Sequence, residues 1–418
     1  MNTFFIRHEF AFSIAFLQYT SGSTSEPKGV MITHSNLAHN LSIITRELQS
    51  NEDTVEVSWL PQYHDMGLIG SYLGVIYCGG CGYYMSPLTF LQRPMIWLEA
   101  ISKYNGTHTQ APNFAYRLTA RKFVSTQYVS NPSTPTPLNS KFSSLPFLNL
   151  SSIRHMINAA EPVDEATIQY FVNSFQPYGL DASTMFPTYG LAEHTVFVCS
   201  GGTQILHVNK LDLEVKRIVN VMDKDLLNKE KIDSNLSSIV GCGYPSKQNV
   251  DVRIVDDESM TEVGEDQVGE IWIRSPSKAA GYFNKEMEND DTFQAKLVLS
   301  EPVDNDSDGY LRTGDLGFYH KKELFICGRS KDLIIVGGRN HYPQDIESSA
   351  EEVSSNFRPG CSAAFSVNPI DKGDEQVALL LELREVPKEK VRLVDFSTLS
   401  SVHSLRIMII HLRNFLFF

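Results

Sequence analysis

Residues 19–30, YTSGSTSEPKGV, gather hydroxyl side chains, two glycines and one lysine around a single proline. The hydroxyl groups of this stretch can donate hydrogen bonds, and its glycines let backbone N–H groups approach a bound group closely. Lys28 adds the positive charge that an anion requires. Together these residue types favour a site that grips a polyphosphate.

The spacing differs from the Walker A phosphate loop, because five residues separate Gly22 from Lys28 and a glycine follows. Linkers can share this composition, but they seldom join an apolar strand to an amphipathic helix. Here residues 12–20, FSIAFLQYT, are typical of a buried strand, and residues 33–48 carry apolar side chains at helical spacing. With Thr33 or Ser35 as N-cap, the pattern predicts a strand-to-helix phosphate loop.

The composition of the 418-residue chain excludes some classes of function. Its 36 Lys and Arg against 49 Asp and Glu give a net charge of −13, which argues against nucleic-acid binding. Six thinly spread cysteines suit a reducing compartment, so we expect a cytoplasmic location. The apolar runs are too short to predict an integral membrane span.

Cys78 and Cys81 form a C-G-G-C that could be half a zinc site or a redox pair. The sequence has no second CxxC and no His pair at ligand spacing to complete a zinc site. Because the surrounding GVIYCGGCGYY is apolar, we favour small buried residues at a tight turn.

Strand-like and helix-like stretches alternate through the first 240 residues, which favours a largely parallel α/β sheet. From about residue 240, short strands joined by Gly and Asp turns indicate an antiparallel or barrel-like unit. A new strand–turn–helix pattern then begins near Ser330 and Lys331, where we expect a boundary.

The loop at 19–30 resembles the phosphate loop of the adenylate-forming superfamily, which includes acyl-CoA synthetases, luciferases and peptide-synthetase adenylation domains. Further stretches resemble that family's motifs in the same order: NAAEPV at 158–163, PTYGLAE at 187–193, YLRTGDLG at 310–317 and GRSKDLIIVGGRNHYPQDIE at 328–347. LQYTSGSTS, LPQYHDMGLIG at 60–70 and GRNHYPQDIE are most similar to fatty acyl-AMP ligases. The resemblance covers roughly residues 15–380.

The resemblance implies a nucleotide site that uses ATP and Mg²⁺. The phosphates would be held by Thr20, Ser21, Gly22, Ser23, Thr24 and Lys28, and Mg²⁺ by Glu193 and Thr24. The base pocket would be lined by Asn158, Ala159, Ala160 and Glu161, and by the turn Thr188, Tyr189 and Gly190, where Tyr189 stacks on adenine. Without the motifs, a solvated Glu193 and a core Tyr189 would be the ordinary interpretations.

Three further roles follow from the resemblance. Asp315 would accept both ribose hydroxyls, and Arg329 would reach the ribose or the α-phosphate. His64 would lie between the nucleotide and the acyl group, and it joins Lys28 as a candidate catalytic residue. An Asp-Gly hairpin turn is the ordinary alternative for Asp315, and a core histidine for His64.

The reaction implied by the resemblance activates a fatty acid to its acyl-adenylate with release of pyrophosphate. The acyl group would then pass to the phosphopantetheine thiol of an acyl carrier protein. Because both reactants are anions, charge neutralisation and alignment are the main tasks of such a site. Two alternatives stay open: a fatty acyl-CoA synthetase of the same fold, and a catalytically impaired nucleotide- or acyl-binding fragment.

The expected fold is α/β: a large adenylate-forming domain of parallel α/β sheets with a small β-barrel-like unit, then a partial small mobile α+β domain. We expect the large domain over 1–330, the small one over 331–385 and an atypical tail over 386–418. By resemblance the chain is truncated at both ends. It would lack the family's N-terminal segment and its late lysine in a Pro-x-Thr-x-x-Gly-Lys context.

Overall fold

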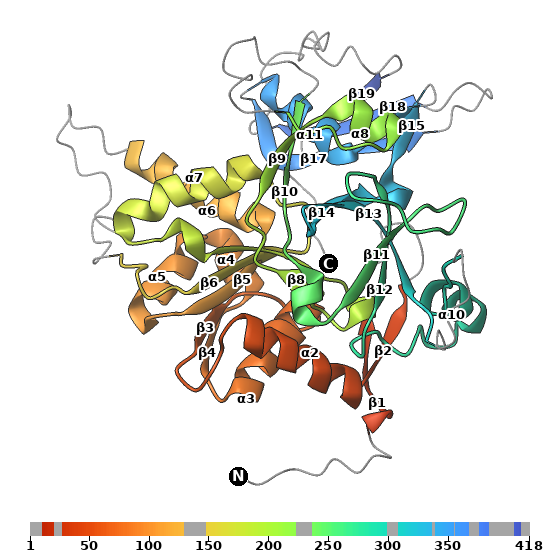
Figure 1. The fold of residues 1–418 in the computed structure, drawn as a ribbon. Helices are drawn as coiled ribbons and strands as arrows, with labels where there is room; N and C mark the ends of the chain where they lie inside the picture. The colour runs from red at the N-terminus through yellow and green to blue at the C-terminus, as the bar shows by residue number, and fades with distance from the viewer. Residues whose placement is uncertain are drawn as a thin grey trace, which may run out of the picture.

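The computed structural model describes residues 11–20, 27–128, 148–222, 236–298, 308–336, 339–354, 356–367, 376–383 and 405–410. Figure 1 shows their arrangement as a ribbon. None of the helices in the described ranges combines the length and the apolar character that a membrane crossing requires.

A six-stranded sheet in the order β4-β3-β5-β6-β7-β8 forms the centre of the first part of the chain. Its strands are β3 (Val55–Ser58), β4 (Cys81–Tyr84), β5 (His108–Pro112), β6 (His155–Ala159), β7 (Met185–Tyr189) and β8 (Cys199–Ser200). Strands β3 to β7 pair in parallel, and β8 runs antiparallel to β7. The predicted largely parallel α/β sheet is confirmed, and its parallel strands bring their carboxyl ends to one edge.

Helices cover both faces of this sheet (Figure 1). One side carries α2 (His34–Glu47), the π-helix η1 (Met66–Leu73) and α3 (Gly74–Cys78); the other carries α6 (Asn113–Tyr128) and α7 (Glu165–Phe175). The short helices α4 (Pro87–Gln92) and α5 (Met95–Tyr104) lie between β4 and β5 in the chain. Trp97, Tyr116 and Phe171 are fully buried and meet edge to face or tilted, joining α5, α6 and α7 in one core.

The loop at 19–30 connects two strands, which corrects the predicted strand-to-helix connection. β1 (Ile14–Tyr19) pairs antiparallel with β2 (Gly29–Thr33), and α2 begins only after β2. Thr33 is the N-cap, as predicted, because its side chain accepts the amide of Asn36 in a capping box. β2 was not predicted, because its five residues are followed directly by the helix with no turn between them. β1 is a strand, as expected, but most of its residues are partly or fully exposed rather than buried.

The region from 200 to 330 is antiparallel. β11 (Asp251–Val255), β12 (Gly269–Arg274), β13 (Leu311–His320) and β14 (Glu323–Arg329) form one sheet in sequence order, and β9 (Ile205–Asn209) pairs with β10 (Leu236–Val240). The described helices of this region are α8 (Lys210–Lys216) and α10 (Glu286–Phe293), with the 3₁₀ turns η5 (Pro245–Gln248) and η6 (Ser330–Asp332). Three further 3₁₀ turns precede it in the chain: η2 (Gln176–Tyr178), η3 (Ala182–Thr184) and η4 (Ala192–His194). The predicted antiparallel strands are confirmed, but the described strands do not close into a barrel.

The end of the chain has a hydrophobic cluster of its own. Its side chains come from β15 (Ile334–Val336), α11 (Pro343–Glu352), β17 (Phe357–Val367) and β18 (Gln376–Leu383). β16 (Arg339–His341) pairs with β15. Within the stretch expected to be an atypical tail, β19 (Leu405–Ile410) pairs in parallel with β18. The separate cluster supports the boundary expected near Ser330, which stays a prediction.

The C-G-G-C turn joins α3 to β4 at the edge of the central sheet. Both cysteines are free thiols; Cys81 is exposed and Cys78 is partly buried. The expectation that both are buried is therefore wrong for Cys81, since β4 is the outermost strand of the sheet. No group of three metal-ligating side chains occurs in the described part of the chain.

Candidate active site

A cluster around Asp315 joins two separate parts of the fold. The Tyr189 hydroxyl donates to Asp315 Oδ2 at 2.6 Å, and Arg329 Nε lies 3.3 Å from Asp315 Oδ1. Tyr189 ends β7 of the central sheet, whereas Asp315 and Arg329 are paired residues of the neighbouring strands β13 and β14. We call Tyr189, Asp315 and Arg329 the Asp315 cluster.

Asp315 is only 7% exposed. Burial raises its pKa to about 6, although the Tyr189 hydrogen bond and the Arg329 charge act in the opposite direction. Asp315 is in the middle of a strand, so the hairpin-turn alternative does not apply. A buried carboxylate that keeps acceptor capacity between a hydroxyl and a guanidinium is suited to binding neighbouring hydroxyl groups.

A second cluster surrounds Lys28, which immediately precedes β2. Its ammonium lies 2.5 Å from Glu288 Oε2 and 4.6 Å from the centre of the Tyr282 ring. The Tyr282 hydroxyl in turn donates to Glu193 Oε1 at 2.8 Å. We call Lys28, Tyr282, Glu193 and Glu288 the Lys28 cluster. Through one tyrosine, it links the residue predicted to bind phosphates to the residue predicted to bind Mg²⁺.

The sequence analysis missed Tyr282. The tyrosine follows Gly281 in an unremarkable stretch. One partner, Glu193, is 89 positions away, and the other, Val30 of β2, lies farther still along the chain. Backbone hydrogen bonds from Met31 to Gly281 and from Phe283 to Gly29 place it beside the hairpin. No local spacing could predict this pairing, because it depends on how two distant segments meet.

The turn that carries Glu193 is clamped by buried hydrogen bonds. The ring of His194 is fully buried and bonds Ser275 Oγ at 2.6 Å and the Phe197 carbonyl at 2.8 Å. Burial lowers the pKa of His194 to about 4, so the ring is neutral at pH 7. Thr195 follows with a φ of 69°, a left-handed backbone that its buried hydrogen bond to Ser277 helps to hold. Glu193 is half-buried on this fixed turn, so the solvated-surface alternative does not describe it.

The predicted base-pocket residues end β6 and β7 at the carboxyl edge of the sheet. Ala160 has a φ of 67°, rare for a residue with a side chain, so the backbone turns sharply there. A side chain at Gly190 would place a Cβ 1.8 Å from the Val196 carbonyl oxygen, so only glycine fits the turn after Tyr189. These turns expose backbone at the edge where parallel sheets bind ligands.

The side chains near those turns have local partners. Asn158 is fully buried and donates to Asn113 Oδ1 at 2.9 Å, and the Glu161 carboxylate accepts the backbone amide of Phe114. The Thr188 hydroxyl donates to the Phe186 carbonyl. Tyr189 is buried within the main hydrophobic cluster, as a core aromatic would be, so its stacking on adenine stays a prediction.

His64 lies in the turn before η1. Its Nδ1 is 2.7 Å from Asp65 Oδ1, and the hydrogen bond to Asp65 raises the pKa of the imidazole. With a side chain 50% exposed, it is not the core histidine considered as an alternative. Among the described residues the polar contacts of its imidazole are with Asp65 and Met66, and none is with the Asp315 or the Lys28 cluster.

Part of the predicted phosphate loop falls outside the described residues: Ser21, Gly22, Ser23 and Thr24. The Thr20 amide donates to the Lys28 carbonyl at 3.0 Å, which closes the neck of the loop. Of the two predicted Mg²⁺ ligands, Glu193 lies within the described residues. Tyr282 engages one oxygen of its carboxylate, so the second can reach a hard cation, which usually takes one or two carboxylates together with phosphate oxygens.

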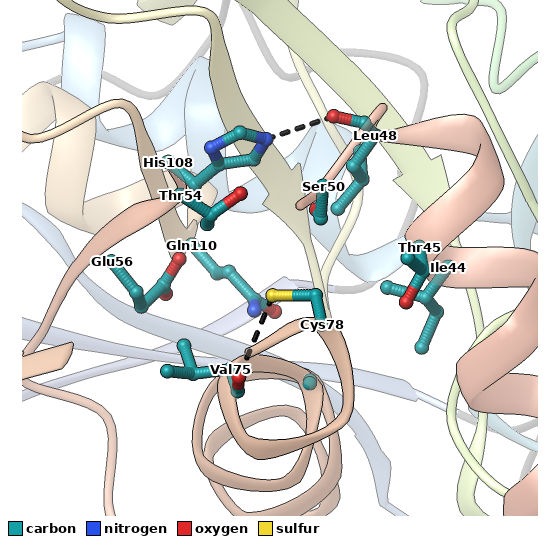
Figure 2. Close-up of a pocket in the computed structure, with 12 residues that line it drawn as sticks. Ile44, Thr45, Leu48, Ser50, Thr54, Glu56, Val75, Cys78, His108 and Gln110 are labelled. Carbon is teal, nitrogen blue, oxygen red and sulfur yellow. Dashed lines mark hydrogen bonds between the residues drawn. The ribbon is translucent and has the colours of Figure 1, made fainter. Parts of the chain in front are cut away.

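A separate cavity lies between α2, β3, α3 and β5 (Figure 2). It is small, with a volume of about 20 Å³ that water-sized molecules can reach. Glu56, Gln110 and His108 line it, and burial raises the pKa of Glu56 to about 7. None of the predicted site residues lines this cavity, so the two clusters form their site elsewhere.

Comparisons with known proteins agree with the sequence resemblance. The family model of AMP-binding enzymes matches residues 9–283. A medium-chain-fatty-acid acyl-carrier-protein ligase of Moorena producens is 39% identical over 92% of this chain and 60% of its own length. A long-chain-fatty-acid–AMP ligase of Mycobacterium marinum is 38% identical over 84% of this chain and 54% of its own length. The chain thus spans little more than half the length of these relatives.

Among solved structures, a fatty acyl-adenylate ligase from Legionella pneumophila in complex with acyl adenylate and pyrophosphate is similar to this chain. It shares 35% sequence identity with a TM-score of 0.67, over 96% of this chain and 67% of that one. The expected α/β adenylate-forming fold is therefore confirmed.

Proposed function

The chain belongs to the family of AMP-binding enzymes, and we propose that it activates a fatty acid to its acyl-adenylate at the expense of ATP. The observation that carries this proposal is the buried Asp315 carboxylate between Tyr189 and Arg329, beside the carboxyl end of β7. Two vicinal hydroxyls of a ribose match a carboxylate that accepts in a bidentate manner. Relatives named as fatty-acid ligases support the choice of acid.

In the proposed reaction a carboxylate oxygen of the fatty acid forms a bond to the α-phosphorus of ATP, and the bond to pyrophosphate breaks. Asp315 would hold the ribose, which fixes the α-phosphate relative to the acid. Arg329, adjacent to Asp315, would offset negative charge at the ribose or α-phosphate. Lys28 would bind the β- and γ-phosphates and stabilise the departing pyrophosphate.

We propose Mg²⁺ as the accompanying ion, with Glu193 as its protein ligand. When bound, such an ion neutralises phosphate charge. Tyr282 and the buried His194 keep the Glu193 carboxylate in place. The role of Thr24 as a second ligand stays a prediction, as does that of His64 beside the acyl group.

For the acceptor we propose the phosphopantetheine thiol of an acyl carrier protein. Its sulfur would attack the acyl carbon and release AMP. The support is the name of the Moorena relative, an acyl-carrier-protein ligase. Coenzyme A carries the same thiol arm, so carrier loading and acyl-CoA formation are to be measured side by side. The cytoplasmic location stays a prediction from the cysteine content.

Fatty-acid-dependent exchange of labelled pyrophosphate into ATP tests the proposed reaction. Saturated acids of eight to sixteen carbons should each be compared with a reaction without acid, and Asp315→Asn serves as the control variant. We expect exchange above background with at least one acid in the parent protein only. If the protein binds ATP but none of these acids supports exchange, fatty-acid activation is not its function.

A further inference from the structure

Lys28 is already engaged by a carboxylate from another element. Glu288, in the first turn of α10, places Oε2 at 2.5 Å from the ammonium, and its Oε1 lies 3.8 Å from Lys285. The side chains of Lys28 and Glu288 are 23% and 41% exposed. The carboxylate therefore occupies a position on the lysine that a phosphate oxygen of a bound nucleotide would need.

The position of Glu288 is built into the fold. Residues 280–283 pair with β2 through backbone hydrogen bonds, including those from Met31 to Gly281 and from Phe283 to Gly29, both 2.8 Å. Asn289, next to Glu288, accepts the Tyr282 amide at 2.6 Å and donates to the Tyr282 carbonyl at 2.9 Å. The same asparagine thus fixes the start of α10 to the tyrosine under the ammonium of Lys28.

We propose that Glu288 sets the affinity of the site for polyphosphate, by competing with the β- and γ-phosphates for Lys28. This inference rests on the proposed function, because it takes Lys28 as a phosphate ligand. A lysine ammonium is a single point charge, so a phosphate that binds it must share it with the carboxylate or displace it. The Tyr282 ring keeps the ammonium in place while its partner changes.

The competition is of moderate strength because the pair is partly exposed. Ion pairs of this kind contribute little to stability, so phosphate can displace the carboxylate readily. Removing the competing charge should tighten polyphosphate binding by about three- to fivefold, the upper part of the range that such a pair supports. Ligands without β- and γ-phosphates should not respond, since they do not reach Lys28.

The test measures the dissociation constants of ATP with Mg²⁺, and of AMP, by isothermal titration calorimetry at low ionic strength, where screening is weak. Glu288→Gln keeps the shape of the side chain and removes its charge. Glu286→Gln is the matched control: it removes the same charge from an exposed residue of the same helical turn. Glu288→Gln should bind ATP about three- to fivefold more tightly than Glu286→Gln, with equal AMP affinity.

The same change in a Lys28→Met variant tests whether the effect depends on the lysine. In Lys28→Met, the further change Glu288→Gln should leave ATP affinity unchanged, because the contested cation is absent. Equal or weaker ATP binding by Glu288→Gln, a matching gain for AMP, or a gain that persists in Lys28→Met would overturn the proposal. A parent protein that binds AMP and ATP equally well would also overturn it, whereas a parent that binds neither nucleotide would instead reject the proposed function.

Discussion

The Asp315 and Lys28 clusters hold their charges in contrasting ways. Asp315 is buried, hydrogen-bonded to the last residue of a central strand, and carries a pKa raised to about 6. Lys28 and Glu288 are partly exposed and come from a hairpin and a short helix at the edge of the molecule. The first arrangement can give specificity for one shape of ligand, and the second can exchange partners at little cost.

The largest effect should follow from breaking the Asp315 cluster. Asp315→Ala removes a carboxylate that would accept two hydroxyls, each bond contributing about 1.5–3 kcal/mol. We expect the affinity for dodecanoyl sulfamoyl adenosine, a stable acyl-AMP analogue, to fall by about 100-fold or more. Calorimetric titration measures it. Parent-like affinity in this variant would remove the ribose role from Asp315.

The ionised Asp315 carboxylate, which would support ligand binding, should lower the stability of the fold. Because burial raises the Asp315 pKa to about 6, the folded chain keeps this proton to a higher pH than the unfolded chain does. The contribution of Asp315 to stability is therefore greatest below its unfolded pKa near 4 and is lost as the pH rises through about 6.

Asp315→Asn lacks this titration. The free energy of unfolding of the variant relative to the parent should therefore rise by about 1–3 kcal/mol between pH 4 and pH 8. Urea denaturation at both pH values measures the difference. A difference that stays constant between them would show that the carboxylate does not sit in the desolvated environment described here.

The Lys28 cluster should respond to a smaller change. Tyr282→Phe removes the hydroxyl that holds Glu193 but keeps the aromatic ring under Lys28. Loss of one hydrogen bond to a charged group should weaken the binding of ATP with Mg²⁺ by about tenfold and leave AMP binding unchanged. If both nucleotides lose affinity equally, Tyr282 supports the whole site rather than its phosphate side.

The two clusters also differ in how far the sequence predicted them. Tyr189 and Arg329 stand in motifs at strand ends, and Asp315 stands in a motif within β13. For all three, local pattern and resemblance together indicated a ligand. Their mutual contact joins β7 to β13 and β14, and no spacing in the sequence encodes it. Tyr282 and Glu288 were missed because they act only through pairing with β2, itself hidden between a loop and a helix.

Local signals were reliable where short-range physics decides the structure. Thr33 was a predicted N-cap because a hydroxyl before a helix satisfies free backbone amides. The exposure of Cys81 was not predictable in this way, since it depends on β4 being the outermost strand. The order of strands in a sheet is a property of the whole chain rather than of the turn.

The central claim is that Asp315 recognises the ribose of an adenylate, and a comparison of AMP with 2′,3′-dideoxy-AMP tests it most directly. Calorimetry of both ligands with the parent and with Asp315→Ala forms a thermodynamic cycle. The parent should prefer AMP by about 100-fold, and Asp315→Ala should bind the two ligands with nearly equal affinity. A parent that binds both ligands equally, or a variant that keeps the full preference, would contradict the account.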